Sequence, residues 1–398
     1  MHLYTFGNFS VLSLFNYLLI FLVAFFCNSS VTCAQKIDYA AAEILTGKVI
    51  SNYPSFPEVN NAALLVRLRA GKLLDGGRPW HRYYNYPEMG INLVAGNLGE
   101  SELFGTLIGA SPEMILTQPL NKKLSISECA GLGISYYTKK YDEEKNPDNI
   151  AIGSHFTAFG SASLRFNYLI NSSLQFSMAL SVLHSSNSHI ALPNVGLNLP
   201  AIGFGINYRF IENKATSIVE KPSFNRKLHF NIKAGLGINE QGSSTAPVNG
   251  PKYPIYIASF FVTKKLSYVN KIQLGLEGYF NTGVYDFIVS ENVYAEHQKK
   301  RACSGFVFAG HEFLFGHFSL PAILGVYFYN PFYQSQYKLY YEDDFKAKFK
   351  NSIVMKIGIQ YYLFNSHTID KYQVYLGTYV KTNFGQADFW ENAIGFQF

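Results

Sequence analysis

The chain has 398 residues, of which 16% are aromatic and only 15% are charged, with a formal net charge of +6 and a mean hydropathy of +0.02. This composition is too apolar and aromatic for a disordered chain, and the small positive charge does not indicate a nucleic-acid partner. Beyond residue 34 only Cys129 and Cys303 remain, too few for a disulfide-stabilised scaffold.

Residues 1–34 have the features of a signal peptide. An apolar run extends from Val11 to Phe26, and Thr32-Cys33-Ala34 offers small residues for cleavage before Gln35. We therefore predict an exported protein whose mature part is residues 35–398.

From Gly90 onward, stretches in which apolar and polar residues alternate with period two are separated by turn-rich segments. No segment after the signal peptide has the uncharged apolar length of a membrane helix. The sequence predicts an all-β, antiparallel transmembrane β-barrel of about 14 strands, within a range of 12 to 16, with aromatic residues marking both membrane interfaces. The predicted strands are 89–98, 105–119, 124–138, 155–170, 173–186, 199–211, 227–239, 253–263, 271–284, 303–315, 318–329, 352–364, 372–382 and 390–398.

Two segments leave the strand count open. Residues 40–75 can add one or two strands, and residues 212–226 show no alternation, which predicts a long periplasmic connection. An alternative is two small barrels divided within 212–226. With the C-terminus in the periplasm, the predicted turns on that side are mostly short and the longer loops lie outside, as is usual for outer-membrane barrels. The closing residues 393–398 alternate and end on Phe398, which resembles the last strand of Gram-negative outer-membrane proteins.

The predicted strand 173–186 carries the clearest candidate site. Leu174, Phe176, Met178, Leu180 and Val182 alternate with small or polar residues, and His184 and Ser186 continue the apolar register. Because alternate strand residues share a face, we expect His184 and Ser186 to lie on the lipid-facing wall near the outer membrane interface.

His184 and Ser186 are a residue pair suited to nucleophilic catalysis. A serine hydroxyl becomes a useful nucleophile when a base lies within hydrogen-bond reach, and histidine is the base most often found. The competing interpretation is that both are polar residues at the head-group level. Polar residues at the end of a lipid-facing stripe favour the functional interpretation.

The residues that follow extend this pair into a longer motif. The stretch His184-Ser185-Ser186-Asn187, followed by Pro193-Asn194-Val195-Gly196, resembles the outer-membrane lipid A 3-O-deacylases of the PagL type and the related acyloxyacyl hydrolases. The pieces 84–90, 96–99 and 151–155 resemble the long Bacteroidetes form. The resemblance covers residues 60–211, and residues 212–398 are predicted to add further strands.

The resemblance implies a role for each motif residue. Ser186 would be the nucleophile, His184 its general base, and Asn194 a donor to the oxyanion, while Asn187 would shape the loop or contribute to substrate binding. The family places a glutamate two residues after the motif glycine to orient the histidine, and here that position is Asn198. An asparagine can orient an imidazole but supplies no charge.

Two functions follow from this sequence. The first is an outer-membrane serine esterase that removes an ester-linked acyl chain from lipid A of lipopolysaccharide, without a cofactor or a metal. The second is a non-catalytic or porin-like outer-membrane barrel, since about fourteen strands would enclose a wide lumen. Both place the protein in the outer membrane of a Gram-negative cell with no nucleic-acid partner.

Overall fold

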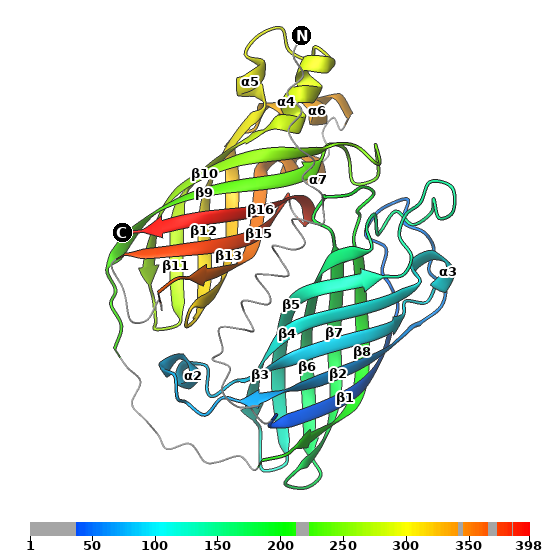
Figure 1. Cartoon of the computed structure of the whole chain (residues 1–398), viewed down its shortest axis with the longest axis vertical. Helices are drawn as coiled ribbons and strands as arrows, with labels where there is room; N and C mark the ends of the chain where they lie inside the picture. The colour runs from blue at the N-terminus through cyan, green and yellow to red at the C-terminus, as the bar shows by residue number, and fades with distance from the viewer. Residues whose placement is uncertain (1–36, 212–222, 341–344, 365–371, 384) are drawn as a thin grey trace. The chain divides into compact units, whose positions relative to one another are not determined.

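The computed structural model describes residues 37–211, 223–340, 345–364, 372–383 and 385–398 (Figure 1). The predicted signal peptide lies outside the described residues, as does most of the predicted connection 212–226. No helix in the described part of the chain is long and apolar enough to cross a membrane.

The described chain forms two separately closed antiparallel barrels of eight strands each (Figure 1). In the first barrel β1 pairs with both β2 and β8, and in the second β9 pairs with both β10 and β16. The first barrel contains β1 (Tyr39–Gly47), β2 (Ala63–Leu73), β3 (Glu88–Asn97), β4 (Thr106–Pro119), β5 (Leu124–Tyr137), β6 (Phe156–Leu169), β7 (Leu174–Ser186) and β8 (Leu197–Arg209). The second contains β9 (Leu228–Glu240), β10 (Lys252–Lys265), β11 (Asn270–Asn281), β12 (Cys303–Phe315), β13 (Phe318–Tyr329), β14 (Ile353–Tyr362), β15 (Gln373–Asn383) and β16 (Gln386–Gln397).

The all-β antiparallel barrel fold is confirmed, but the prediction of one barrel of about 14 strands is wrong. The two strands β1 and β2 come from the segment 40–75, and the sheet closes at β8 instead of continuing into β9. Residues 228–397 therefore form a barrel of their own. The alternative of two small barrels is the one the structure shows.

In the part of the chain that the structure describes, six helices of four to ten residues lie in the connections between strands. In the first barrel they are α2 (Pro79–Tyr83) and α3 (Ser101–Phe104), and in the second α4 (Thr282–Ser290), α5 (Gln298–Arg301), α6 (Pro331–Tyr340) and α7 (Phe345–Ser352). The predicted strand 271–284 ends early at Asn281, whose side-chain oxygen accepts hydrogen bonds from the amides of Gly283 and Val284 and so caps α4.

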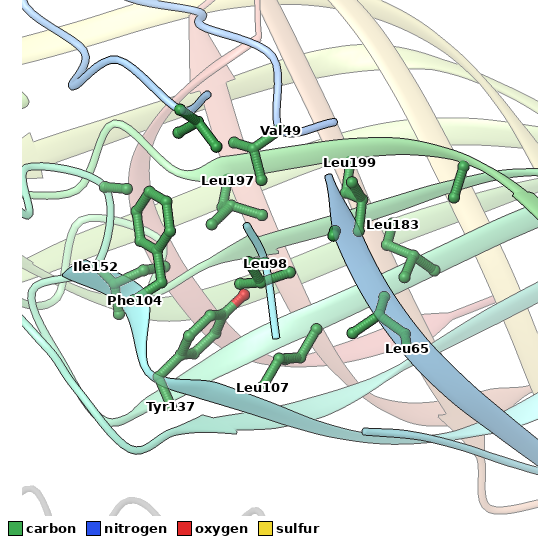
Figure 2. Packing of buried hydrophobic residues seen from close by; sticks show 14 of the residues in the cluster. Val49, Leu65, Leu98, Phe104, Leu107, Tyr137, Ile152, Leu183, Leu197 and Leu199 are labelled. Carbon is green, nitrogen blue, oxygen red and sulfur yellow. The ribbon is translucent and has the colours of Figure 1, made fainter. Parts of the chain in front are cut away.

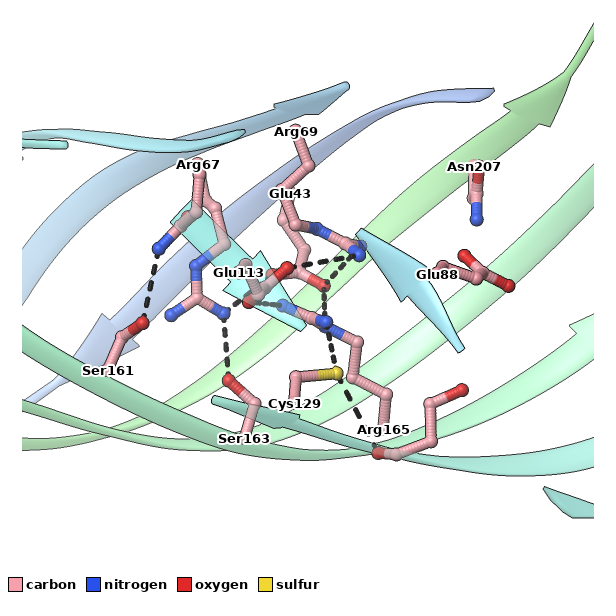
Figure 3. Close-up of polar contacts among 12 residues, drawn as sticks. Glu43, Arg67, Arg69, Glu88, Glu113, Cys129, Ser161, Ser163, Arg165 and Asn207 are labelled. Carbon is pink, nitrogen blue, oxygen red and sulfur yellow. Dashed lines mark hydrogen bonds and ion pairs between the residues drawn. The ribbon is translucent and has the colours of Figure 1, made fainter. Parts of the chain in front are cut away.

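Buried ion pairs occupy the interior of the first barrel (Figure 3). Glu43 accepts from Arg67, Arg69 and Arg165 at 3.0, 3.3 and 3.2 Å, and Arg165 also pairs with Glu113 at 3.1 Å. All five side chains are at most 5% exposed. An eight-stranded barrel is just wide enough for side chains to fill its interior, and these residues do so.

An apolar cluster continues this filling toward the end of the barrel where β7 stops (Figure 2). It packs inward-facing strand residues such as Leu65, Leu107 and Leu183 against Phe104 and Ile152 from the connecting segments. Burial of these side chains stabilises the loops at that end, which include the candidate site residues.

The second barrel has a comparable charged interior. Lys233 lies 2.9 Å from both Glu277 and Glu391, and Lys356 lies 2.5 Å from Glu277 and also pairs with Glu391. These four residues are at most 3% exposed. Both barrels therefore have packed, charge-compensated interiors.

Candidate active site

His184 and Ser186 lie at the end of β7 on the outer wall of the first barrel. Leu180 and Val182, which precede them in the same register, are 48% and 53% exposed, whereas Leu183 and Ser185 on the opposite face are 2% exposed. His184 is exposed and Ser186 is half-buried. The structure thus brings the imidazole and the hydroxyl to the exterior circumference of the barrel.

Asn198 lies directly opposite His184 on the neighbouring strand β8. Its side-chain oxygen is 2.8 Å from Nδ1 of His184. An amide oxygen can only accept, so this contact places the ring proton on Nδ1 and leaves the lone pair on Nε2. Asn198 is itself held by the bridge from the Ile50 amide to its carbonyl oxygen, at 3.0 Å.

Asn194 contacts Ser186 from the loop between β7 and β8. Its Nδ2 donates to the Ser186 hydroxyl oxygen at 3.0 Å, while its Oδ1 accepts from the Asn187 amide at 3.1 Å. The Ser186 hydroxyl also lies 3.4 Å from Oδ1, so both ends of the amide are beside the serine and Nδ2 is the nearer one. A donor held at this point is suited to stabilise an oxyanion that forms beside the hydroxyl.

Asn187 holds the loop itself. Its Nδ2 donates to the carbonyl of Ala191 at 2.6 Å and to the hydroxyl of Ser154 at 3.2 Å. The residue is 5% exposed, so these contacts are made in a buried position.

Gly196 lies beside the site, immediately before β8. Its φ of +75° lies in the left-handed region, and a Cβ there would lie 3.4 Å from the His184 ring and 3.7 Å from Cβ of Ser186. A side chain at this position would be strained and would fill the space between the two reactive groups. The motif glycine therefore keeps that space open.

One contributor to the site carries no sequence signal. The backbone amide of Ser188 donates to the Ser186 hydroxyl oxygen at 3.2 Å. Every residue type except proline has this donor, and its position here depends on the left-handed conformation of Ser188, whose φ is +56°. Together with Asn194 it gives the serine two neighbouring donors.

Two other histidines, His155 and His189, make contacts of their own. The ring of His155 lies 2.7 Å from the carbonyl of Tyr137 and stacks on Tyr136. Burial lowers the pKa of His189, and its Nε2 lies 3.3 Å from the carbonyl of Gly242. Among the described residues no group of three or more histidine, cysteine, aspartate or glutamate side chains could hold a metal ion.

The comparisons with known proteins match both barrels to families. A model described as lipid A 3-O-deacylase (PagL) matches residues 65–207, and one described as acyloxyacyl hydrolase, C-terminal domain, matches residues 227–375. No curated protein matches the chain.

Several solved structures are similar to the chain at low identity. The outer membrane enzyme PagL is 12% identical, covering 42% of this chain and 97% of its own, with a TM-score of 0.29. CdiB from Acinetobacter baumannii is 8% identical over 92% of this chain and 60% of its own, with a TM-score of 0.19. The NanC porin is 8% identical over 90% of this chain and 98% of its own, with a TM-score of 0.16.

The two matched families are both families of ester hydrolases, and with the barrel fold they define the class of this protein as an outer-membrane hydrolase of Gram-negative cells. More particularly, the chain belongs to the lipid A 3-O-deacylase and acyloxyacyl hydrolase family. The predicted family, enzyme class and localisation are confirmed.

Proposed function

We propose that the protein is a serine esterase that hydrolyses an ester-linked acyl chain of lipid A, using Ser186 and His184 on the outer-leaflet side of the first barrel. The observation that carries this proposal is the position of both groups on the apolar outer wall, where His184 is exposed and Ser186 is half-buried. Acyl chains of lipid A lie in the membrane beside that wall, so the ester can reach the serine without leaving the bilayer.

The geometry supports a two-step acyl transfer. Nε2 of His184 accepts the proton of Ser186 as the hydroxyl oxygen attacks the ester carbonyl. Nδ2 of Asn194 and the amide of Ser188, both within 3.2 Å of the serine oxygen, donate to the oxyanion of the tetrahedral intermediate. The His184 imidazolium then gives this proton to the departing alkoxide oxygen, which leaves as a hydroxyl group. Water, activated by the same ring, hydrolyses the acyl-enzyme and regenerates the serine.

The proposal is tested by the lipid A of cells that produce the protein. We expect mass spectrometry to detect lipid A that has lost one acyl chain, in a Gram-negative host without a deacylase of its own. Heat-modifiable gel mobility of the barrel is the control for folding. Unchanged lipid A in the presence of folded protein would reject the esterase assignment.

The porin-like alternative is opposed by the filled interiors. Side chains such as Arg67, Arg165 and Lys356 occupy the barrels and are at most 2% exposed. We therefore expect no solute flux in a liposome-swelling assay with the purified protein. Flux without deacylation would favour a channel.

Asn198 offers a test of how the imidazole is oriented. Asn198→Ala removes the acceptor at Nδ1, and the loss of a hydrogen bond with a net value of about 1–1.5 kcal/mol should slow deacylation about tenfold. Asn198→Asp keeps the shape and adds a charge that stabilises the imidazolium, so its rate should exceed that of wild type, by about fivefold for an interaction of ~1 kcal/mol. Initial rates on purified lipid A measure both. A slower Asp variant would show that the amide is the better partner.

A further inference from the structure

The second barrel contacts the loop that carries Asn194. These contacts come from the end of β9 and the segment that follows it, residues 240–252, and they reach the segment 187–196 between β7 and β8. The two segments are about fifty positions apart in the chain, so the contacts between them form only when both barrels have folded.

Glu240 makes two of these contacts. Its backbone amide donates to the carbonyl of His189 at 2.9 Å, and its carboxylate accepts from the amide of Leu192 at 3.1 Å. The carboxylate is held in turn by the amide of Gly250 at 2.6 Å and by the ammonium group of Lys252. Glu240 is fully buried, so these bonds are made where water does not compete with them.

Two further contacts lie closer to Asn194. The Asn194 amide donates to the carbonyl of Ser244 at 2.7 Å, and the Ser244 hydroxyl bonds to the side chain of Gln386 at the start of β16. Gly242 packs against Leu192, since a Cβ there would come within 2.8 Å of the leucine side chain. Leu192, Asn194 and Ser244 are at most 4% exposed.

We propose that residues 240–244 of the second barrel are a positioning element for the esterase site, with Glu240 as its principal side chain. By holding both the middle of the 187–196 loop and the backbone of Asn194, the element keeps Nδ2 of Asn194 directed at Ser186. The inference rests on the proposed function for its catalytic consequence, but the anchoring itself is independent of catalysis. Through this element, the second barrel supports catalysis at the site on the first barrel.

The test uses the full-length protein in detergent with Glu240→Ala and the milder Glu240→Gln, which keeps an oxygen for the Leu192 amide. The matched control is Glu312→Gln. Glu312 is another buried carboxylate of the second barrel, but its partners are Lys271 and Tyr362 rather than residues of the loop. Heat-modifiable mobility verifies that each variant is folded.

Hydrogen–deuterium exchange of the peptide 187–196 is the first measurement. Loss of hydrogen bonds to a charged group should raise its exchange rate about tenfold or more in Glu240→Ala, less in Glu240→Gln and not at all in Glu312→Gln. The second measurement is deacylation. We expect kcat to fall about tenfold in Glu240→Ala while KM stays near the wild-type value, because only oxyanion stabilisation is lost.

The outcomes separate the two proposals. Unchanged exchange in Glu240→Ala, or an equal rise in Glu312→Gln, would overturn the positioning role even if the wild type deacylates lipid A. Raised exchange confined to the Glu240 variants would support the anchoring even if the wild type has no activity, in which case the esterase proposal alone fails. Raised exchange with unchanged kcat would overturn the catalytic consequence.

Discussion

Cells producing Ser186→Ala should retain fully acylated lipid A, with the deacylation rate reduced at least about a thousandfold relative to wild type. The hydroxyl is the atom that forms the acyl-enzyme, and the alanine methyl cannot replace it. Oxyanion donors such as Nδ2 of Asn194 would remain in place, so any residual rate would measure their contribution without a nucleophile. Mass spectrometry of lipid A and initial rates on purified substrate give the result.

The adjacent serine is a matched control. Ser185 lies on the inward face of β7, is 2% exposed, and its hydroxyl lies 3.2 Å from that of Ser135. Ser185→Ala changes the same chemical group one position away, on the opposite side of the barrel wall. It should keep wild-type activity. Activity retained in Ser186→Ala, or lost equally in both variants, would contradict the assignment of the nucleophile.

The second large effect concerns stability. Glu43→Gln should lower the free energy of unfolding by about 3–5 kcal/mol, the usual cost of removing one partner from a buried ion pair. Arg69 and Arg165 would keep Glu113 as an ion-pair partner, but Arg67 would lose the carboxylate that it pairs with inside the closed barrel. Urea titration in phospholipid vesicles, read by the loss of the folded gel band, measures the change.

Glu128 is the control for this prediction. It lies in β5 of the same barrel, but it is exposed on the outer wall and makes no ion pair or hydrogen bond that we find within the described ranges. A charge facing lipid costs free energy, so Glu128→Gln should leave stability unchanged or raise it. Destabilisation by both substitutions to a similar extent would show that the interior ion pairs contribute nothing particular.

Strand positions were predictable from sequence because alternation is a local property. Each strand from β3 to β16 overlaps a predicted one, since the side chains of successive residues face lipid and interior in turn. The strand β1 was left open because Ala40, Ala41 and Ala42 interrupt the alternation of apolar and polar residues. In β2, Arg67 and Arg69 face the interior, where the sequence alone gives no reason to expect charged side chains. Their ion pairs with the buried Glu43 explain this position.

The number of barrels was not decided by alternation, because one wide barrel and two narrow ones use the same local pattern. Closure depends on which distant strands pair. The first barrel closes through the pairing of β1 with β8, in which Tyr39 lies opposite Arg209. The second closes through the pairing of β9 with β16, in which Ile238 lies opposite Trp390. Neither pairing has a signature within its own strand.

The candidate site likewise combines residues of one local motif with groups that only the folded chain brings near. His184, Ser186 and Asn194 lie within one short motif, and Asn198 lies two residues after the motif glycine. The structure pairs His184 with Asn198 and Ser186 with Asn194. The amide of Ser188 and the carboxylate of Glu240 were missed. The first is a backbone group, and the second reaches the loop only through the folding of a separate barrel.

The independent closure of the two barrels has a consequence for biogenesis. The strand that ends the polypeptide, β16, seals against β9 and leaves the first barrel untouched. The first barrel closes instead through the pairing of β8 with β1, and Phe204, Ile206 and Tyr208 of β8 form an outward stripe that Phe210 continues just after the strand. Because each sheet closes on itself, the first barrel needs no strand of the second barrel to complete its ring of hydrogen bonds during membrane assembly.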